Sequence, residues 1–227
     1  LAIDAASFFG SLLLLWLAGR RFSAPLLPLS GEEEAPAPLR WQTLTVRQKR
    51  SLLILPALTA VGSPAMALLP ALAQQLHPQD AAGLALPLLF ARSMGQLCGP
   101  MLLKKESLTR FAAHTPRIIF CLGIFLTGYG VLPFLSGWTA CALGMIFIAH
   151  LASNVLFAAG TFGVLSSFHF TQTASASGKA WRWQTLSASL FTGIAAMVAV
   201  EFGSVQALYT VSSAALLLVA LIMRRYR

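Results

Sequence analysis

An arginine lies in the middle of one long apolar stretch of this sequence. Arg92 stands about 11 residues from either end of the stretch 81–103. A charged side chain at the centre of a hydrocarbon layer costs about 2.5–3.5 kcal/mol on insertion scales, so it should face a bundle interior or a water-filled cavity. There, a guanidinium can bind an anionic solute or gate a pathway. The alternative is a structural arginine that caps carbonyl groups or pairs with another helix.

Two glycines follow this arginine at helical spacing. Gly95 lies three residues after Arg92 and Gly99 lies seven after it, so the three share one face of a helix. The pattern Gly-x-x-x-Gly allows close approach of a second helix. We therefore expect Gly95 and Gly99 to form a helix-packing surface beside the buried charge.

A histidine and an asparagine mark a second apolar stretch, 138–165. His150 and Asn154 are four residues apart, which puts them on one helical face near the middle of the stretch. A half-polar face at that depth is typical of a cavity wall, and a histidine there can take part in a proton relay. The alternative is a packing histidine whose hydrogen bonds are satisfied within the bundle.

Two acids also fall inside apolar stretches. Asp4 lies in 1–19, and Glu201 lies two or three residues from the end of 183–203. Proton-coupled carriers use intramembrane carboxylates, whereas an acid near a helix end can simply sit at the membrane surface. Glu201 and Arg92 differ in depth by roughly 12 Å at 1.5 Å per residue, so we expect no direct contact between them.

The elements that carry these residues are long and apolar. The 227-residue chain is 57% hydrophobic and only 10% charged. A bilayer core of about 30 Å requires roughly 20 apolar residues in a helix, and continuous apolar runs exclude the alternating strands of a barrel. We predict an all-α, polytopic membrane bundle of about seven transmembrane helices, at 1–19, 51–73, 81–103, 118–136, 138–165, 183–203 and 205–223.

The basic residues predict how the bundle is oriented. All but one of the 16 Lys and Arg residues lie in four segments that alternate with the predicted spans: 20–50, 104–117, 179–182 and 224–227. Seven spans put these segments on one side, and the positive-inside rule makes that side cytoplasmic. The sequence thus predicts a multi-pass protein of the cell (inner) membrane with a cytoplasmic C-terminus.

The spacing of the predicted spans divides the chain into one helix and six. The single span 1–19 is followed by a cytoplasmic linker, 20–50, and then by the six-helix segment 51–227. The end of the linker, Leu39–Arg50, is expected to form a short helix along the membrane surface.

Several function classes lack support in the sequence. No phosphate-binding loop, zinc-protease motif or nucleophile elbow occurs, so we expect neither an ATP-driven motor nor an enzyme. Cys98, Cys121 and Cys141 lie in apolar runs without metal-ligand spacing, and we expect no metal and no cofactor. The net charge of +9 comes from clusters between apolar runs, which argues against a nucleic-acid partner.

Three hypotheses from different classes remain. The first is a secondary transporter. The second is a non-transporting membrane scaffold, receptor or assembly protein. The third is a membrane-embedded enzyme acting on lipid, which would need several His, Asp or Glu residues at one membrane depth.

The motifs at 4–8, 91–100 and 178–184 resemble the major facilitator superfamily, in particular its bacterial enterobactin and macrolide exporters. Asp4-Ala5-Ala6-Ser7-Phe8 is similar to the D-A-x-S-F opening of the sixth helix of that family. Ala91-Arg92-Ser93-Met94-Gly95 with Gly99-Pro100 is similar to a pattern on the eighth helix. Gly178-Lys179-Ala180 with Gln184 resembles the entry to the eleventh helix.

This resemblance implies a fold and a mechanism. It makes 1–19 the last transmembrane helix of an N-terminal half and 51–227 the C-terminal six-helix half, with the N-terminal half of the same transporter as partner. It implies proton-coupled efflux of a small molecule by alternating access. Arg92, His150 and Asn154 would line a central cavity, and Asp4 and Glu201 are the further candidates for the transport pathway.

Overall fold

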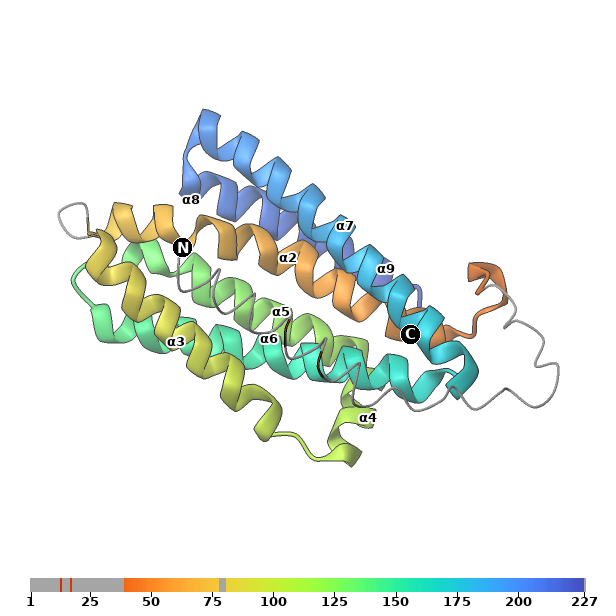
Figure 1. Cartoon of the computed structure of the whole chain (residues 1–227). Helices are drawn as coiled ribbons and strands as arrows, with labels where there is room; N and C mark the ends of the chain where they lie inside the picture. The colour runs from red at the N-terminus through yellow and green to blue at the C-terminus, as the bar shows by residue number, and fades with distance from the viewer. Residues whose placement is uncertain (1–12, 14–16, 18–38, 78–80, 227) are drawn as a thin grey trace. The chain divides into compact units, whose positions relative to one another are not determined.

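The computed structural model describes residues 13, 17, 39–77 and 81–226 (Figure 1). The chain divides into two compact units, Leu1–Pro38 and Leu39–Arg227, and all elements named below belong to the second. Every regular element among the described residues is helical, which confirms the all-α prediction. They are η1 (Trp41–Thr43), α2 (Val46–Leu76), α3 (Ala81–Met101), α4 (Lys105–Ala113), α5 (Thr115–Gly130), η2 (Leu132–Phe134), α6 (Thr139–Ser167), α7 (Phe170–Phe202), α8 (Ser204–Ala207), the π-helix η3 (Leu208–Ser212) and α9 (Ser213–Arg224).

Within the described residues, five helical segments are long and apolar enough to cross a membrane. They are Val46–Leu76, Thr115–Phe134, Thr139–Ser167, Phe170–Phe202 and Ser204–Arg224. This finding confirms the prediction of several membrane-spanning helices. The 21-residue helix α3 is not among the five. The predicted span 1–19 falls outside the described residues apart from Leu13 and Leu17, so the total of seven stays a prediction.

Helix α2 is the most buried of the membrane-length helices and packs against α7, α6 and α3. It begins with a capping box, in which Gln48 and Thr45 satisfy each other's backbone N–H groups. Pro56, Pro64 and Pro70 lie inside the helix. Each proline removes one intrahelical hydrogen bond, which weakens the helix locally and favours bending there.

Helix α7 is much longer than the sequence predicted. The expected connection 166–182 is helical almost throughout, because α6 runs to Ser167 and α7 begins at Phe170. Lys179 and Arg182 therefore lie on α7 itself. At 1.5 Å per residue, its 33 residues extend about 50 Å, well beyond a hydrocarbon layer of about 30 Å.

Two predicted connections also differ from expectation. The segment 39–50 does not form a separate surface helix. Instead, Trp41–Thr43 is one short turn and Val46 already begins α2. The connection 104–117 contains the nine-residue helix α4, which is strongly amphipathic, with Glu106 in its first turn and Arg110 in its last.

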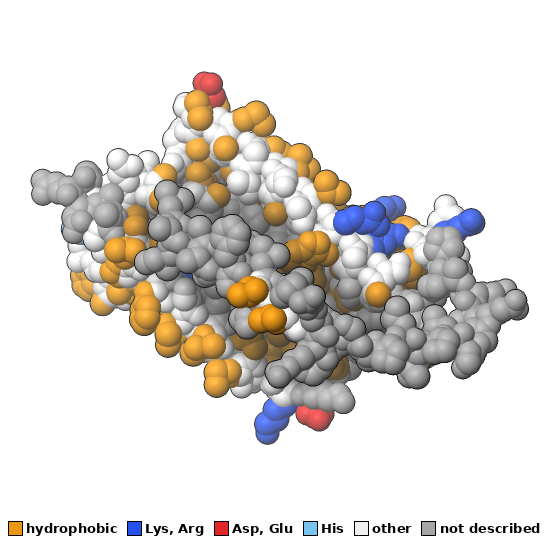
Figure 2. Space-filling model, in the orientation of Figure 1, with side chains coloured by type: hydrophobic (Ala, Val, Ile, Leu, Met, Phe, Trp, Pro, Cys, Tyr) orange, Lys and Arg blue, Asp and Glu red, His pale blue; other side chains and the backbone are white. Residues whose placement is uncertain are grey.

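Basic side chains gather at one end of the bundle. Apart from Arg92, the described Lys and Arg residues lie in 40–50, 104–117, 179–182 and 224–225. The start of α2, helix α4 and the end of α9 lie at the same end of the structure (Figure 1). Figure 2 shows blue side chains at that end, while orange hydrophobic side chains cover the helices behind it. We call this the basic end. The side of the membrane that it faces stays a prediction.

Candidate functional site

A polar cavity lies inside the bundle. It has a volume of about 270 Å³ and is bounded by side chains from α2, α3, α5, α6 and α7. Its apolar wall includes Phe125 and Phe157. Its polar wall consists of Thr59, Gln96, His150, Ser153, Asn154 and Gln184. Six polar side chains around one cavity in an otherwise apolar bundle are unusual, since polar groups in a membrane interior are costly and mark solute or ion pathways.

His150 forms the fully buried part of the wall. Its Nε2 lies 2.7 Å from the hydroxyl oxygen of Tyr129, which is also fully buried. The ring of Phe125 packs edge-on against the imidazole at 5.4 Å between centroids. The other ring nitrogen of His150, Nδ1, is buried and has no hydrogen-bond partner among the described residues. The imidazole is thus hydrogen-bonded at Nε2 and has no hydrogen-bond partner at Nδ1 among the described residues.

Ser153 and Asn154, which follow His150 on α6, complete the polar wall on that helix. Ser153 Oγ donates to the His150 carbonyl oxygen at 3.0 Å, and Asn154 Nδ2 donates to the same oxygen at 3.1 Å. These bonds fix both side chains against α6. The Asn154 amide oxygen makes no hydrogen bond within the described structure, so it is able to accept one from a polar solute or from water.

The opposite wall joins α2 to α7. Thr59 Oγ1 donates to the Gln184 carbonyl oxygen at 3.0 Å, one turn after the helix-breaking Pro56. Gln184 Oε1 is buried and has no partner among the described residues. Two residues of the wall, His150 and Gln184, therefore each carry one buried polar atom without a partner among the described residues. Buried polar groups in native proteins are normally hydrogen-bonded, to protein or to water.

Gly95 and Gly99, the predicted helix-packing surface of α3, lie directly against α6, the helix that carries His150. A Cβ added to Gly95 would overlap the Phe147 carbonyl oxygen and lie 3.0 Å from the His150 Cβ. A Cβ added to Gly99 would lie 2.8 Å from the Leu151 carbonyl oxygen. The backbones of α3 and α6 approach so closely that only glycine fits at these two positions. This contact sets Gln96, between the two glycines, against the cavity.

Arg92 lies beside the cavity but not in its wall. The side chain is half-buried on α3, and Gln96, one turn later, lines the cavity instead.

Of the two candidate acids, the one that the structure describes, Glu201, is not part of this site. Glu201 is exposed in the last turn of α7, far along the helix from Gln184. Asp4 lies outside the described residues. Of the two described acids, Glu106 and Glu201, neither forms an ion pair with Arg92.

A second cavity adjoins the first along α6 and α7. It has a volume of about 190 Å³, and Phe157 and Gln184 line both cavities. It extends past Thr161 and Val164 toward the basic end. Phe157 and Thr161 continue the helical face of His150 and Asn154, so the polar face of α6 borders two successive spaces.

Sequence reasoning missed several members of this site. Gln96 and Thr59 are single polar residues in apolar stretches, and Gln184 entered only as part of a motif. Their common signal is a polar residue at span depth, the same signal that singled out Asn154. Tyr129 gave no signal, because tyrosine is common near membrane interfaces.

The described residues contain no group of three or more His, Cys, Asp or Glu side chains able to hold a metal ion. No protein-family model matches this chain, and neither the curated proteins nor the solved structures contain a match. Any functional assignment must therefore come from the residues and their geometry.

Proposed function

We propose that this chain is part of a secondary transporter that moves a small molecule across the membrane, coupled to protons, by alternating access. The observation that carries the proposal is the half-open cavity of about 270 Å³ with its six polar side chains, most of them on helices of membrane-spanning length. Polar side chains in an apolar bundle are costly, and a solute pathway accounts for six of them around one cavity.

The geometry assigns roles to the wall residues. Asn154, Gln96 and Gln184 present amide groups from three helices and would hydrogen-bond the solute. His150 is the titratable group of the wall, and its imidazole would exchange the coupling proton. Arg92, half-buried one turn before Gln96 on α3, would supply a positive charge beside the solute pathway.

The mechanism needs a helix that can bend. Helix α2 carries three prolines and contributes Thr59 to the cavity, so bending at Pro56 would shift this wall against α7. Following the resemblance to the major facilitator superfamily, we propose that the pathway is completed by a second six-helix half and that the two halves rock around the cavity.

Cysteine accessibility tests whether the cavity is wet. In a background without Cys98, Cys121 and Cys141, single cysteines at Gln96 and Asn154 should react with a small, membrane-impermeant thiol reagent. Ile148 is the matched control, because it lies on α6 among apolar residues outside this cavity. We expect at least about tenfold faster modification at Asn154 than at Ile148. Equal protection at Gln96, Asn154 and Ile148 would show that the polar face is merely packed.

Transport itself is tested in everted vesicles that contain the intact protein and are energised by a proton gradient. Ethidium and erythromycin serve as probes, since the resemblance points to exporters of organic molecules. Asn154→Leu should reach normal membrane abundance yet lose uptake into the vesicles, while Ile148→Ala should retain it. If Asn154→Leu transports each probe as well as the unchanged protein does, the cavity is not the pathway.

A further inference from the structure

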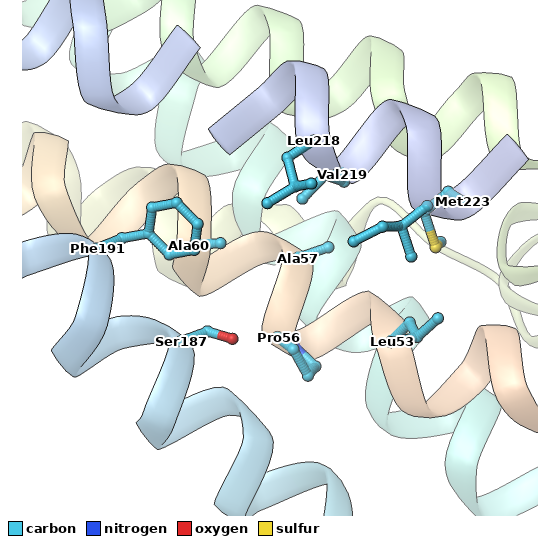
Figure 3. A pocket seen from close by; sticks show the side chains of 10 residues that line it. Leu53, Pro56, Ala57, Ala60, Ser187, Phe191, Leu218, Val219 and Met223 are labelled. Atoms are coloured by element: carbon cyan, nitrogen blue, oxygen red, sulfur yellow. The ribbon is translucent and has the colours of Figure 1, made fainter. Parts of the chain in front are cut away.

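A third space, which is apolar, lies on the side of α2 that faces away from the polar cavity. It has a volume of about 230 Å³ and is lined by α2, α7 and α9. Figure 3 shows Leu53 and Ala57 of α2, Phe191 of α7 and Val219 of α9 around it. Ser187 is the only residue in its wall with a polar side chain. We call this space the α2–α7–α9 slot.

The slot lies just below the basic end. Lys49 stands four residues before Leu53 on α2, and Arg225, the C-cap of α9, stands three residues after Ile222 in helical conformation. Residues three and four apart share a helical face, so both cations lie above the slot rather than on the far sides of their helices. Arg50 Nη1 donates to the Tyr226 carbonyl oxygen at 3.3 Å and ties α2 to the end of α9 at this level.

Aromatic side chains lie at the same level. The ring of Trp41 packs edge-on against Trp183 of α7 at 5.1 Å and against Tyr226 at 5.9 Å between centroids. Lys49 Nζ lies 5.8 Å from the Trp41 ring centroid. Trp, Tyr and Lys side chains gather at the boundary between hydrocarbon and headgroups. This cluster therefore indicates that the slot begins at the depth where lipid headgroups give way to acyl chains.

We propose that the α2–α7–α9 slot binds an anionic phospholipid, with one acyl chain in the slot and its phosphate between Lys49 and Arg225. Charge complementarity selects this occupant. The rim carries cations from two helices, and the only described acid on α2, α7 or α9 is Glu201, at the opposite end of α7. An apolar slot below a cationic rim matches a molecule with an apolar tail and an anionic head. The proposal does not depend on the transport function.

Lipid binding to the detergent-solubilised full chain tests the site. Native mass spectrometry would compare palmitoyl-oleoyl phosphatidylglycerol with the phosphatidylcholine that has the same chains. The unchanged protein should prefer phosphatidylglycerol. Lys49→Gln with Arg225→Gln should weaken that lipid roughly 30-fold, on the basis of about fivefold for each interfacial cation. Arg110→Gln with Arg117→Gln is the matched control, since it removes the same charge at the basic end but away from the slot, and it should leave binding unchanged.

Two further measurements distinguish the contribution of the apolar slot from that of its cationic rim. Ser187→Leu fills the slot without touching the rim and should weaken both lipids. Soluble sn-glycerol 3-phosphate should compete poorly, because it lacks the acyl chain. The proposal is overturned by equal affinity for the two lipids, by equal losses in the two double variants, or by an unchanged Ser187→Leu. Competition by glycerol phosphate at the lipid's own affinity would also overturn it, since that outcome indicates a plain phosphate site.

Discussion

The polar cavity and the α2–α7–α9 slot use the same two helices in opposite ways. Thr59 and Gln184 line the cavity, whereas Ala60 and Ser187, one and three residues further along, line the slot. The cavity side carries amides and a histidine at mid-bundle, while the slot side is apolar and carries charge only at its rim. On α2 the two spaces lie on different faces of the helix, whereas on α7 Gln184 and Ser187, three residues apart, share one face and border the two spaces at successive turns.

The two regions also differ in how tightly their walls are held. Next to the cavity, α3 and α6 meet backbone to backbone through Gly95 and Gly99. Around the slot, the helices leave space that Phe191 and Met223 border without filling. We expect substitutions at the cavity contact to be poorly tolerated and substitutions in the slot to be well tolerated. The predictions below test this difference.

Gly95→Leu should produce the largest effect. Its side chain would meet the backbone of α6 at Phe147, and backbone cannot move aside as a flexible side chain can. Overpacking of this kind costs about 1–3 kcal/mol or more. We expect little folded protein in the membrane, measured by fluorescence-detected size-exclusion chromatography.

Gly123→Leu and Gly144→Leu are the controls for this prediction, because an added Cβ at either position meets nothing within 4 Å. Both should accumulate normally. If all three variants show the same fall in folded protein, these helices tolerate no larger side chain at any of the three positions. That result would contradict the view that the close contact between α3 and α6 makes Gly95 special.

Tyr129→Phe should have an intermediate effect. It removes the hydroxyl that lies 2.7 Å from His150 Nε2 and leaves both ring nitrogens without a partner among the described residues. An unsatisfied buried polar group costs about 1–3 kcal/mol. We expect a clear fall in Tm in detergent, measured by intrinsic fluorescence.

The comparison variant is Tyr209→Phe. Tyr209 donates to the Gly130 carbonyl oxygen at 2.6 Å, but in a half-buried position where water can replace it. Its Tm should fall less. A larger loss in Tyr209→Phe than in Tyr129→Phe would contradict the view that the cavity wall depends on the buried pair.

Gln184→Leu and Ser187→Leu should have the smallest effects on stability and should separate the two regions by function. Gln184→Leu removes a buried oxygen without a partner and should raise stability by on the order of 1 kcal/mol while abolishing transport. Ser187→Leu should leave both Tm and vesicle transport near normal. Measuring transport per molecule of protein is essential here. Equal transport by the two variants would contradict the functional distinction between the cavity and the slot.

The sequence by itself determined the properties that depend on short stretches of chain. Continuous apolar runs predicted membrane-length helices, because hydrophobic length is local and a helix satisfies its own backbone. The 3.6-residue period also placed His150 on one face with Asn154, and Gly95 with Gly99. These faces are the ones that the structure brings together between α3 and α6.

Only the tertiary structure decided which of those faces meet and what they enclose. Tyr129 reaches His150 from α5, and Gln184 closes the cavity from α7, although neither residue stands out among its neighbours in the sequence. Likewise, the polar segment 170–182 continues α7 because Leu52 and Val164 pack with Ala176 and Ala180 on that helix. Contacts between helices depend on side chains distant in sequence, so no periodicity within one stretch contains them.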